Sequence, residues 1–377
     1  MDFDFTDDQV SLRDAVARWV DKGFSFERRH AVARAGGATR EVYGELAGLG
    51  LTALAVPEAH GGMGFGPVEA MVVMEELGRG LVNAPLAQSA LIAPALLAHA
   101  PEALQAAWLP KIADATALVV LAHQERGARY HLDRVATRAA QAGGAHHLSG
   151  VKSVVPAGDE ADAFIVPANL GGGDDDDTGI ALFLVERGAP GVTVRGYPTQ
   201  DGARAAELTL ADTPAQLITI DGLQALQAGI DVGIAAVCAE GVGVMDKLVA
   251  ITVDYMNTRK QFGATLASFQ ALRHRIADVK MQLELARSMS YYATLRLNDP
   301  EPRRRQAIAQ AKVQIGNAAR FVGQQCIQLH GGIGVTDEYI ASHYFKRLTM
   351  IEMQFGDTLH HLGEVSARMQ ETAGALA

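Results

Sequence analysis

One acidic residue near the C-terminal end lies where a catalytic base could be placed. Asp357 stands in the stretch MIEMQFGDTLHH, between a Phe-Gly pair and a Thr, where one helical pattern ends and another begins. A carboxylate held in such a loop can act as a general base. Aspartate is also a preferred helix N-cap, which would accept hydrogen bonds from the first amides of the following helix. The sequence favours the N-cap and keeps the base as the alternative.

Other residue types that could do chemistry have simpler interpretations. The glycines of GGMGFG, residues 61–66, lack the G-x-G-x-x-G spacing, and no Lys-Ser/Thr follows, so a turn is predicted rather than a phosphate loop. Four aspartates at 174–177 lack the alternating spacing of a calcium loop and predict a solvated hairpin loop. No metal is expected, because the histidines show no ligand spacing: His330, His343, His360 and His361.

Composition restricts the class of protein. A chain of 377 residues exceeds the size of most single cores, so two or three domains are expected. A net charge of -10 argues against nucleic acid as a partner, and no apolar run approaches the roughly 18 residues of a membrane helix. We find no signal-peptide pattern. Cys238 and Cys326 are isolated within apolar helical patterns, which indicates packing thiols in a reducing compartment and a cytoplasmic protein.

The elements that must position any site fall into three blocks, which we take as domains. Residues 1–116 are predicted to be helical: Thr6 and Gln9 form a capping-box pattern, and further helices are expected at 40–49 and from Pro67. Residues 117–222 contain short runs rich in β-branched residues between Gly, Pro and Asp, which is typical of an antiparallel sandwich or barrel.

Residues 223–377 are predicted to form a bundle of long helices. Apolar residues recur with helical spacing in three segments, and NDPEP at 298–302 separates the second from the third. Long helices joined by short turns form an up-down bundle. The third apolar face comprises Ile308, Ile315, Val322, Cys326 and Leu329.

Four ordered motifs carry a resemblance to a known family. They are LTALAVPEAHGGMGFG (51–66), HLSGVKSVV (147–155), YMNTRKQFGATLASFQALRHRIADV (255–279) and CIQLHGGIGVTDEYIASHYFKRL (326–348). They resemble the acyl-CoA dehydrogenase family. That resemblance implies an α+β, mainly α fold: an N-terminal helical domain, a middle antiparallel β-barrel or sandwich domain and a C-terminal four-helix bundle.

A narrower resemblance concerns two-subunit members of the family. The segments HQERGARYHLDRVAT, YPTQDG, GQQCIQLHGGIG and HYFKRLTMIE are similar to the small subunit of pimeloyl-CoA dehydrogenase and its relatives. The resemblance implies an FAD-dependent enzyme that converts an acyl-CoA to the trans-2-enoyl-CoA and passes electrons to an electron-transfer flavoprotein. It also implies a tetramer, built with a homologous large subunit or as a homo-oligomer.

Several residues match the positions that contact FAD in the family. Arg259, Gln261 and Phe262 match a loop that contacts the pyrophosphate across a subunit interface, and Gln328, Gly331 and Gly332 match a second contact. An arginine at a helix end can form charge-assisted bonds to phosphate, and glycine lets backbone amides approach closely. A surface arginine and a simple helix stop remain the alternatives. Thr358 matches the threonine of the family's YEGT motif.

The β-domain half of the flavin site matches less well. QERGARYHL aligns with the family's TEPxxGSD segment: Glu125 is kept, but Tyr130 replaces the serine. Val154 stands where an aromatic residue is expected. The remaining candidates for backbone contacts with the flavin are Leu121, His123 and Gln124.

The catalytic base of the family is missing from both of its usual positions. The glutamate of YEGT aligns with Gly356, and the alternative position on the first bundle helix aligns with Gly233. Asp357 and Glu240, the latter two helical turns beyond Gly233, are the substitutes to weigh, with a cap and a structural role as their respective alternatives. The Gly356 amide could still donate to the thioester oxygen, because that donor needs no side chain.

Three functions follow from this pattern. The first is an acyl-CoA dehydrogenase, especially a small subunit whose partner supplies the base. The second is a non-catalytic scaffold subunit of the same fold. The third is a flavin oxidase or a desaturase acting on a non-CoA acyl carrier.

Overall fold

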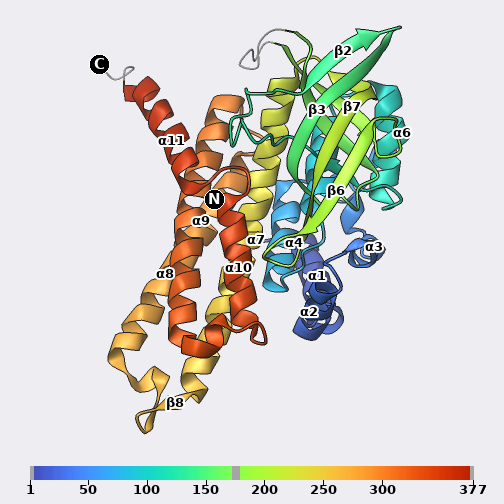
Figure 1. Ribbon diagram of the computed structural model, residues 1–377. Coiled ribbons are helices and arrows are strands. Elements are labelled where there is room, and N and C mark those ends of the chain that lie inside the picture. Colours follow the sequence, from blue (N-terminus) through green and yellow to red (C-terminus); the bar gives the residue numbers. More distant parts are fainter. Residues whose placement is uncertain (1–3, 172–178, 374–377) are drawn as a thin grey trace. The chain divides into compact units, whose positions relative to one another are not determined.

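The structure is a computed structural model that describes residues 4–171 and 179–373 (Figure 1). The chain forms two compact units. The first, which we call the bundle unit, comprises Met1–Arg29, Pro67–Val82 and Ile234–Ala377. The second, the barrel unit, comprises His30–Gly66 and Asn83–Gly233. The N-terminal third of the chain therefore contributes helices to both units. The aspartate run predicted to be a loop lies outside the described residues.

The bundle unit begins with two helices from the N-terminal third. Helix α1 (Asp7–Gly23) packs against α4 (Pro67–Arg79). The predicted capping box is present: the Thr6 hydroxyl accepts from the Gln9 amide, and the Gln9 side chain accepts from the Thr6 amide. Both predicted helix starts, near Thr6 and at Pro67, are confirmed.

Over the described residues, the rest of the bundle unit consists of α7 from Ile234 onward, four further α-helices, two short 3₁₀ helices and a small hairpin. They are α7 (Gly222–Thr258), the hairpin β8 (Lys260–Gln261) and β9 (Ala264–Thr265), η5 (Leu266–Ser268), α8 (Gln270–Arg296), α9 (Glu301–His330), η6 (Gly331–Val335), α10 (Ile340–Met353) and α11 (Thr358–Ala373). Helix α9 packs against α8, α10 and α11 (Figure 1). Its five predicted apolar residues are all buried. The break between α8 and α9 falls at the predicted prolines because a proline ring cannot continue a helix.

The barrel unit contains the main sheet. Its strands are β1 (Val119–Leu121), β2 (Arg138–Ala142), β3 (Ala145–Pro156), β4 (Ala163–Asn169), β5 (Ile180–Glu186), β6 (Val192–Pro198) and β7 (Arg204–Thr219). β4, β2, β3, β7 and β5 pair in that order, and β5 pairs back to β4, so these five close into a barrel. Pairing is antiparallel except for β1–β4 and β2–β4, which are parallel. Sequence reasoning missed β2, because RAAQA has no β-branched residue.

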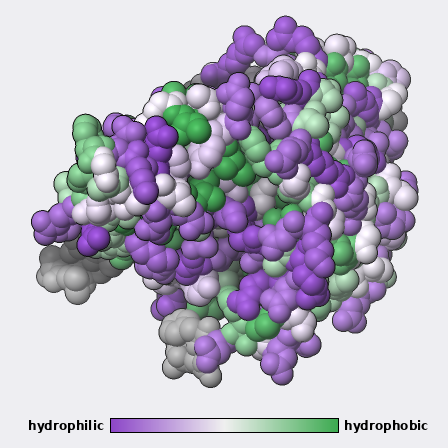
Figure 2. Space-filling model, turned by 90° about the horizontal axis from the view of Figure 1, so that it is seen from below, coloured by the Kyte–Doolittle hydropathy of each residue, from purple (hydrophilic) through white to green (hydrophobic). Residues whose placement is uncertain are grey.

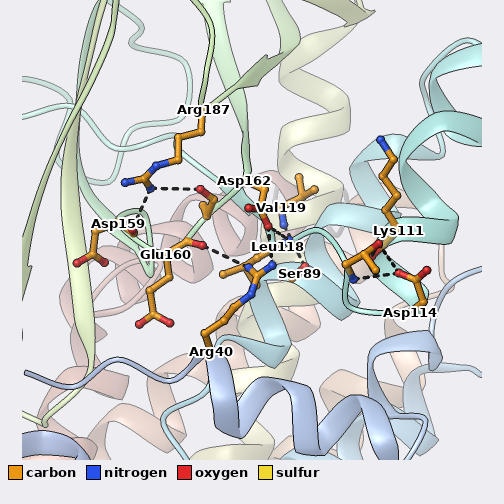
Figure 3. A network of polar contacts seen from close by, with 12 residues as sticks. Arg40, Ser89, Lys111, Asp114, Leu118, Val119, Asp159, Glu160, Asp162 and Arg187 are labelled. Carbon is orange, nitrogen blue, oxygen red and sulfur yellow. Dashed lines mark hydrogen bonds and ion pairs between the residues drawn. The ribbon is translucent and has the colours of Figure 1, made fainter. Parts of the chain in front are cut away.

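Helical elements complete the barrel unit. They are α3 (Arg40–Gly48), η1 (Leu51–Ala53), η2 (Glu58–His60), η3 (Ala87–Ile92, a π-helix), α5 (Ala93–Leu97) and α6 (Glu102–Ala113), with α2 (Phe26–Arg34) at the boundary with the bundle unit. Asp162 connects helix and sheet: its carboxylate accepts from Arg40 and from the Leu118 amide, at 2.8 and 2.7 Å (Figure 3). Arg187 donates to nearby backbone carbonyls (Figure 3). These contacts fix the start of β1 beside β4.

The surface carries no extended apolar band on the face seen in Figure 2, where hydrophilic and hydrophobic side chains alternate. Among the described helices, none is both long enough and apolar enough to cross a membrane.

Candidate functional site

A pocket at one end of the bundle unit collects five of the six residues matched to the flavin pyrophosphate loops. It has a volume of about 450 Å³. Its lining comes from the end of α7, the β8–β9 hairpin, the start of α8 and the end of α9: Tyr255, Arg259, Gln261, Leu266, Leu272, Arg275, Gln328, Leu329, His330, Gly331 and Gly332. We call it the arginine pocket. Segments about 70 residues apart in sequence thus meet here, with two guanidinium groups on the wall.

The hairpin after α7 places Arg259 and Gln261. The Arg259 amide donates to the Tyr255 carbonyl (2.8 Å), so this arginine completes the last turn of α7. Phe262 and Gly263 form the two-residue turn, with φ of 52° and 79°, the positive pair that a type I′ hairpin requires. Phe262 is therefore held at the tip, 95% exposed, and does not line the pocket.

Two glycines after α9 are not explained by packing. A Cβ atom on Gly331 or Gly332 would have no atom of the described residues within 4 Å, apart from those of its own chain neighbours. Gly331 has a φ of 65°, which glycine adopts readily, but Gly332 needs no such conformation. Close approach of a ligand to the backbone is what would require glycine at 332.

His330 adds a polar atom with no hydrogen-bond partner to this pocket. Its ring packs against those of Tyr255 and Tyr339, with centroids 4.6 and 5.1 Å away. Nδ1 lies 2.8 Å from the Cys326 carbonyl and must be the donor there, while Nε2 is buried without a hydrogen-bond partner among the described residues. Burial lowers the pKa of His330, so Nε2 carries a lone pair. Buried polar atoms without a partner are uncommon and indicate a missing ligand or water.

The position of the family's glutamate is closed to any side chain. Gly356 lies between α10 and α11 with a φ of 111°, and a Cβ atom there would come within 2.6 Å of the His360 ring and 2.7 Å of the His361 ring. The carboxylate is therefore excluded by geometry as well as absent from the sequence. Thr358, beside it, donates its hydroxyl to Glu352 (3.0 Å) and lies outside the arginine pocket.

Asp357 makes the capping bond that its position predicted. Its Oδ1 accepts from the His360 amide at 2.8 Å, three residues into the turn that begins α11. The carboxylate thereby satisfies an amide that has no partner within the helix. Its geometry is that of an N-cap.

Glu240 is held in a buried ion pair. Both of its oxygens accept from Arg347, at 2.5 and 2.7 Å, and its side chain is almost fully buried in the bundle unit. A two-point pair with arginine restricts the rotation of the carboxylate. Gly233, the other position expected for the base, lies on α7 and offers no side chain.

Two buried side chains near Gly356 were not predicted. Lys312 donates to the carbonyls of Glu352 (2.7 Å) and Gly356 (2.8 Å), and His361 Nε2 lies 3.0 Å from the Phe355 carbonyl. Burial lowers the pKa of Lys312 to about 8 and that of His361 to about 3. One signal was present in the sequence: Lys312 interrupts the apolar face of α9, between Ile308 and Ile315.

The barrel unit holds the remaining candidates around a buried ion pair. Glu125 accepts from Lys152 Nζ (2.6 Å), from the Ala136 amide and from the hydroxyl of Thr137. Burial lowers the pKa of Lys152 to about 8, against the opposing effect of Glu125. The sequence shows that Glu125 is kept, but it carries no signal for the pairing of Glu125 with Lys152.

The three backbone candidates of the barrel unit differ in what they offer. Leu121 is buried within β1. The Gln124 carbonyl accepts from the Ser153 amide (2.8 Å), which uses one of its two lone pairs. Burial, with the Lys152 ammonium nearby, lowers the pKa of His123 to about 3, which keeps its ring neutral. Val154, where an aromatic residue was expected, has a φ of 51°, a strained conformation for a β-branched residue.

Sequence comparison assigns all three parts of the chain to one family. Residues 6–116, 121–213 and 221–370 match the descriptions "Acyl-CoA dehydrogenase, N-terminal domain", "middle domain" and "C-terminal domain". The order of helical domain, β-barrel and helical bundle defines the fold class of these flavoprotein oxidoreductases. The chain belongs to the acyl-CoA dehydrogenase family.

Relatives and solved structures agree with this assignment. Acyl-CoA dehydrogenase FadE27 of Mycobacterium tuberculosis is 28% identical over 349 residues, 88% of this chain and 89% of that protein. A variant of the Tcur3481-Tcur3483 steroid ACAD is 29% identical, with a TM-score of 0.88 over 97% of this chain and 99% of that chain. The ChsE4-ChsE5 complex from Mycobacterium tuberculosis is 27% identical, with a TM-score of 0.89 over 98% of this chain and 99% of that chain.

Proposed function

We propose that this chain is a subunit of an FAD-dependent acyl-CoA dehydrogenase that binds flavin but takes its catalytic base from a partner chain. The observation that carries the proposal is the contrast between an assembled arginine pocket and a base position that cannot hold a side chain. Asp357 caps a helix and Glu240 is paired with Arg347, so neither carboxylate has the geometry of a free base.

The arginine pocket fits the pyrophosphate end of FAD. Arg259 and Arg275 supply positive charge, Gln261 and Gln328 supply amide donors, and Gly332 leaves the backbone open to close approach. The lone pair of His330 suits a hydroxyl or amine donor of the same cofactor. Members of the family are FAD-dependent flavoproteins, and FAD, when bound, accepts the hydride from the β-carbon of the acyl group.

The chain's own part in the reaction is to bind and polarise the thioester. Removal of the α-proton gives the thioester oxygen enolate character, and a backbone amide aimed at that oxygen stabilises the charge. The Gly356 N–H has no hydrogen-bond partner among the described residues and is available for this role. With FAD as the hydride acceptor and a carboxylate of the partner as the proton acceptor, the product would be the trans-2-enoyl-CoA.

A homologous partner is supported by two surface features. Phe262 is almost fully exposed at the hairpin tip beside the arginine pocket, an expensive position for an aromatic side chain in water. A second hollow of about 410 Å³ lies between α8, α9 and α11 and includes the half-exposed Leu285 and Leu362. The similar structures include the ChsE4-ChsE5 complex, in which two named components are joined. A small subunit of the pimeloyl-CoA dehydrogenase type fits these features.

An electron-transfer flavoprotein would reoxidise the reduced flavin, as the family resemblance implies. A cytoplasmic location accords with the two cysteines, both of which are buried free thiols.

The test is flavin content with and without a homologous partner. The purified chain, and the chain co-expressed with a homologous acyl-CoA dehydrogenase encoded beside it, are scanned for flavin absorbance and for bleaching by acyl-CoA. We expect bleaching only in the complex. Bleaching of the chain alone would contradict the divided site, and absence of flavin from both preparations would favour a scaffold.

Arg259→Met adds a residue-level control to this test. Loss of a charge-assisted bond to phosphate costs about 1.5–3 kcal/mol, so flavin affinity should fall by roughly ten- to 150-fold. Arg273→Met is the matched control, because Arg273 begins the same region of α8 but lies outside the pocket lining. Equal flavin affinity in the two variants would remove Arg259 from the site.

A further inference from the structure

The connection between α10 and α11 is held from its buried side by two side chains that no catalytic role requires. Lys312 reaches it from α9 and donates to two carbonyls, one at the end of α10 (Glu352, 2.7 Å) and one in the connection (Gly356, 2.8 Å). His361, from the first turn of α11, lies with Nε2 3.0 Å from the Phe355 carbonyl and must donate to it. Two consecutive carbonyls of the connection, at Phe355 and Gly356, are therefore both hydrogen-bonded.

Because each peptide unit is planar, a hydrogen bond to its carbonyl also fixes the direction of its N–H group. No peptide bond of the described residues is cis, and in a trans peptide the N–H points opposite to the C=O of the same unit. The Phe355 carbonyl points at His361, so the Gly356 N–H points away from His361. The bond from Lys312 fixes the next peptide unit in the same way.

The orientation is enforced against local strain. Phe355 adopts a φ of 58° and Gly356 a φ of 111°, conformations that a free loop would leave easily. Lys312 is fully buried and His361 is 2% exposed, so water cannot replace either donor. The Gly356 N–H, in contrast, lacks a partner among the described residues although Gly356 is buried. A buried amide without a hydrogen bond is rare and indicates a missing acceptor.

We propose that Lys312 and His361 are positioning residues that aim the Gly356 amide at the carbonyl oxygen of an acyl thioester. The inference rests on the proposed function, because the acceptor is the thioester oxygen. The clamp, defined as these two side chains, acts through the backbone and touches neither substrate nor cofactor. It explains why a lysine interrupts the apolar face of α9.

The clamp can be tested with a spectroscopic reading of the thioester itself. A hydrogen bond to a carbonyl lowers its stretching frequency, which isotope-edited infrared difference spectra resolve for a ¹³C-labelled carbonyl. The flavin-loaded complex is titrated with butyryl-, octanoyl- and pimeloyl-CoA, and the tightest binder is used in labelled form. In the wild-type protein we expect the band of the bound thioester below that of the free ligand.

Two substitutions remove one donor each. Lys312→Met and His361→Phe should lose most of this frequency shift and weaken binding by about fivefold, the value of one hydrogen bond. His361→Gln, which restores a donor of similar reach, should recover part of the shift. Ile315→Val is the matched control: it disturbs the packing of α9 close to Lys312 and should lower Tm without moving the band.

The outcomes separate the clamp from the function on which it rests. If the wild-type protein binds none of the three acyl-CoA probes, the proposed function is wrong and the clamp falls with it. If the wild-type band shifts and Lys312→Met keeps that shift in full, the proposed function stands and the clamp is overturned. Loss of the shift in Ile315→Val as well would show general loosening and would also overturn the clamp.

Discussion

Two connections between helices of the bundle unit have opposite designs. The one between α7 and α8 is open: its hairpin presents Arg259 and Gln261 to a pocket and leaves Phe262 in solvent. The one between α10 and α11 is closed: its carbonyls are bonded to Lys312 and His361, and its central glycine has no room for a side chain. The first can recognise a ligand through side chains, whereas the second can act only through its backbone.

The largest expected effect is a loss of unfolding free energy on substitution of Glu240. This substitution also tests whether Glu240 replaces the base that the closed connection lacks. Glu240→Gln leaves Arg347 buried without its counter-charge, which costs about 3–5 kcal/mol of unfolding free energy. We expect this loss in urea unfolding, while turnover per bound flavin in the complex changes little. Glu338→Gln, at an exposed position, is the control. Loss of turnover with unchanged stability would instead identify Glu240 as the base.

A matched pair of alanine substitutions contrasts the two connections directly. Gly356→Ala places a Cβ against two histidine rings at a positive φ and should cost about 2 kcal/mol or more of unfolding free energy. Gly332→Ala meets open space and should leave the unfolding free energy within about 0.5 kcal/mol. Its effect should appear as weaker flavin binding. Equal stability losses at both positions would erase the distinction between the connections.

The closed connection should also make the protein acid-sensitive. The pKa of His361 is lowered to about 3 in the folded state, mainly by burial, whereas an unfolded histidine titrates near 6.5. Between these values the unfolded chain binds more protons, so stability falls as the pH drops from about 6.5 toward 3. The contribution of His361 to the slope of the unfolding free energy against pH is about 1.4 kcal/mol per pH unit in this range.

Urea unfolding at several pH values measures this slope. His361→Phe should reduce the slope by one proton relative to the wild type. His123, whose pKa is also lowered to about 3, belongs to the barrel unit and keeps its own contribution in that variant. An unchanged slope in His361→Phe would show that His361 does not titrate as its burial requires.

The smallest effect is expected for Asp357, the acid near the C-terminal end that could have been a catalytic base. Asp357→Asn keeps an oxygen that can accept from the His360 amide, so stability should change by only a few tenths of a kcal/mol. Turnover of the complex should stay within about twofold, because the capping role survives. A fall of a hundredfold or more with the helix intact would make Asp357 the base and contradict the divided site.

Local sequence patterns predicted the elements well and the contacts poorly. The capping box at Thr6, the start of α4 at Pro67 and the buried face of α9 are local patterns, and all three are confirmed. Strand β2 was missed because its alanines carry no local preference, and pairing with β3 makes it a strand. Which strand or side chain a residue pairs with depends on residues far away in the sequence.

For the candidate site, motif spacing in the sequence identified the residues, but only the fold determined which other residues they contact. The motifs around Arg259 and Gln328 predicted a shared ligand, and the structure brings both into one pocket. Nothing in the sequence paired Glu240 with Arg347, 107 positions away, or placed Lys312 beneath Gly356, 44 positions away. Those pairings arise from helix packing, which joins residues without regard to their separation along the chain.

The sequence by itself determined the family, the helical and β segments and the loss of the family's glutamate, because each depends on residue identity at fixed spacing. Tertiary structure decided what that loss means. At Gly356 the glycine is required, since its φ and two histidine rings exclude a side chain, and the surrounding donors hold its backbone in place. The sequence shows only that the carboxylate is missing at Gly356, whereas the structure shows that the backbone amide there has a fixed direction.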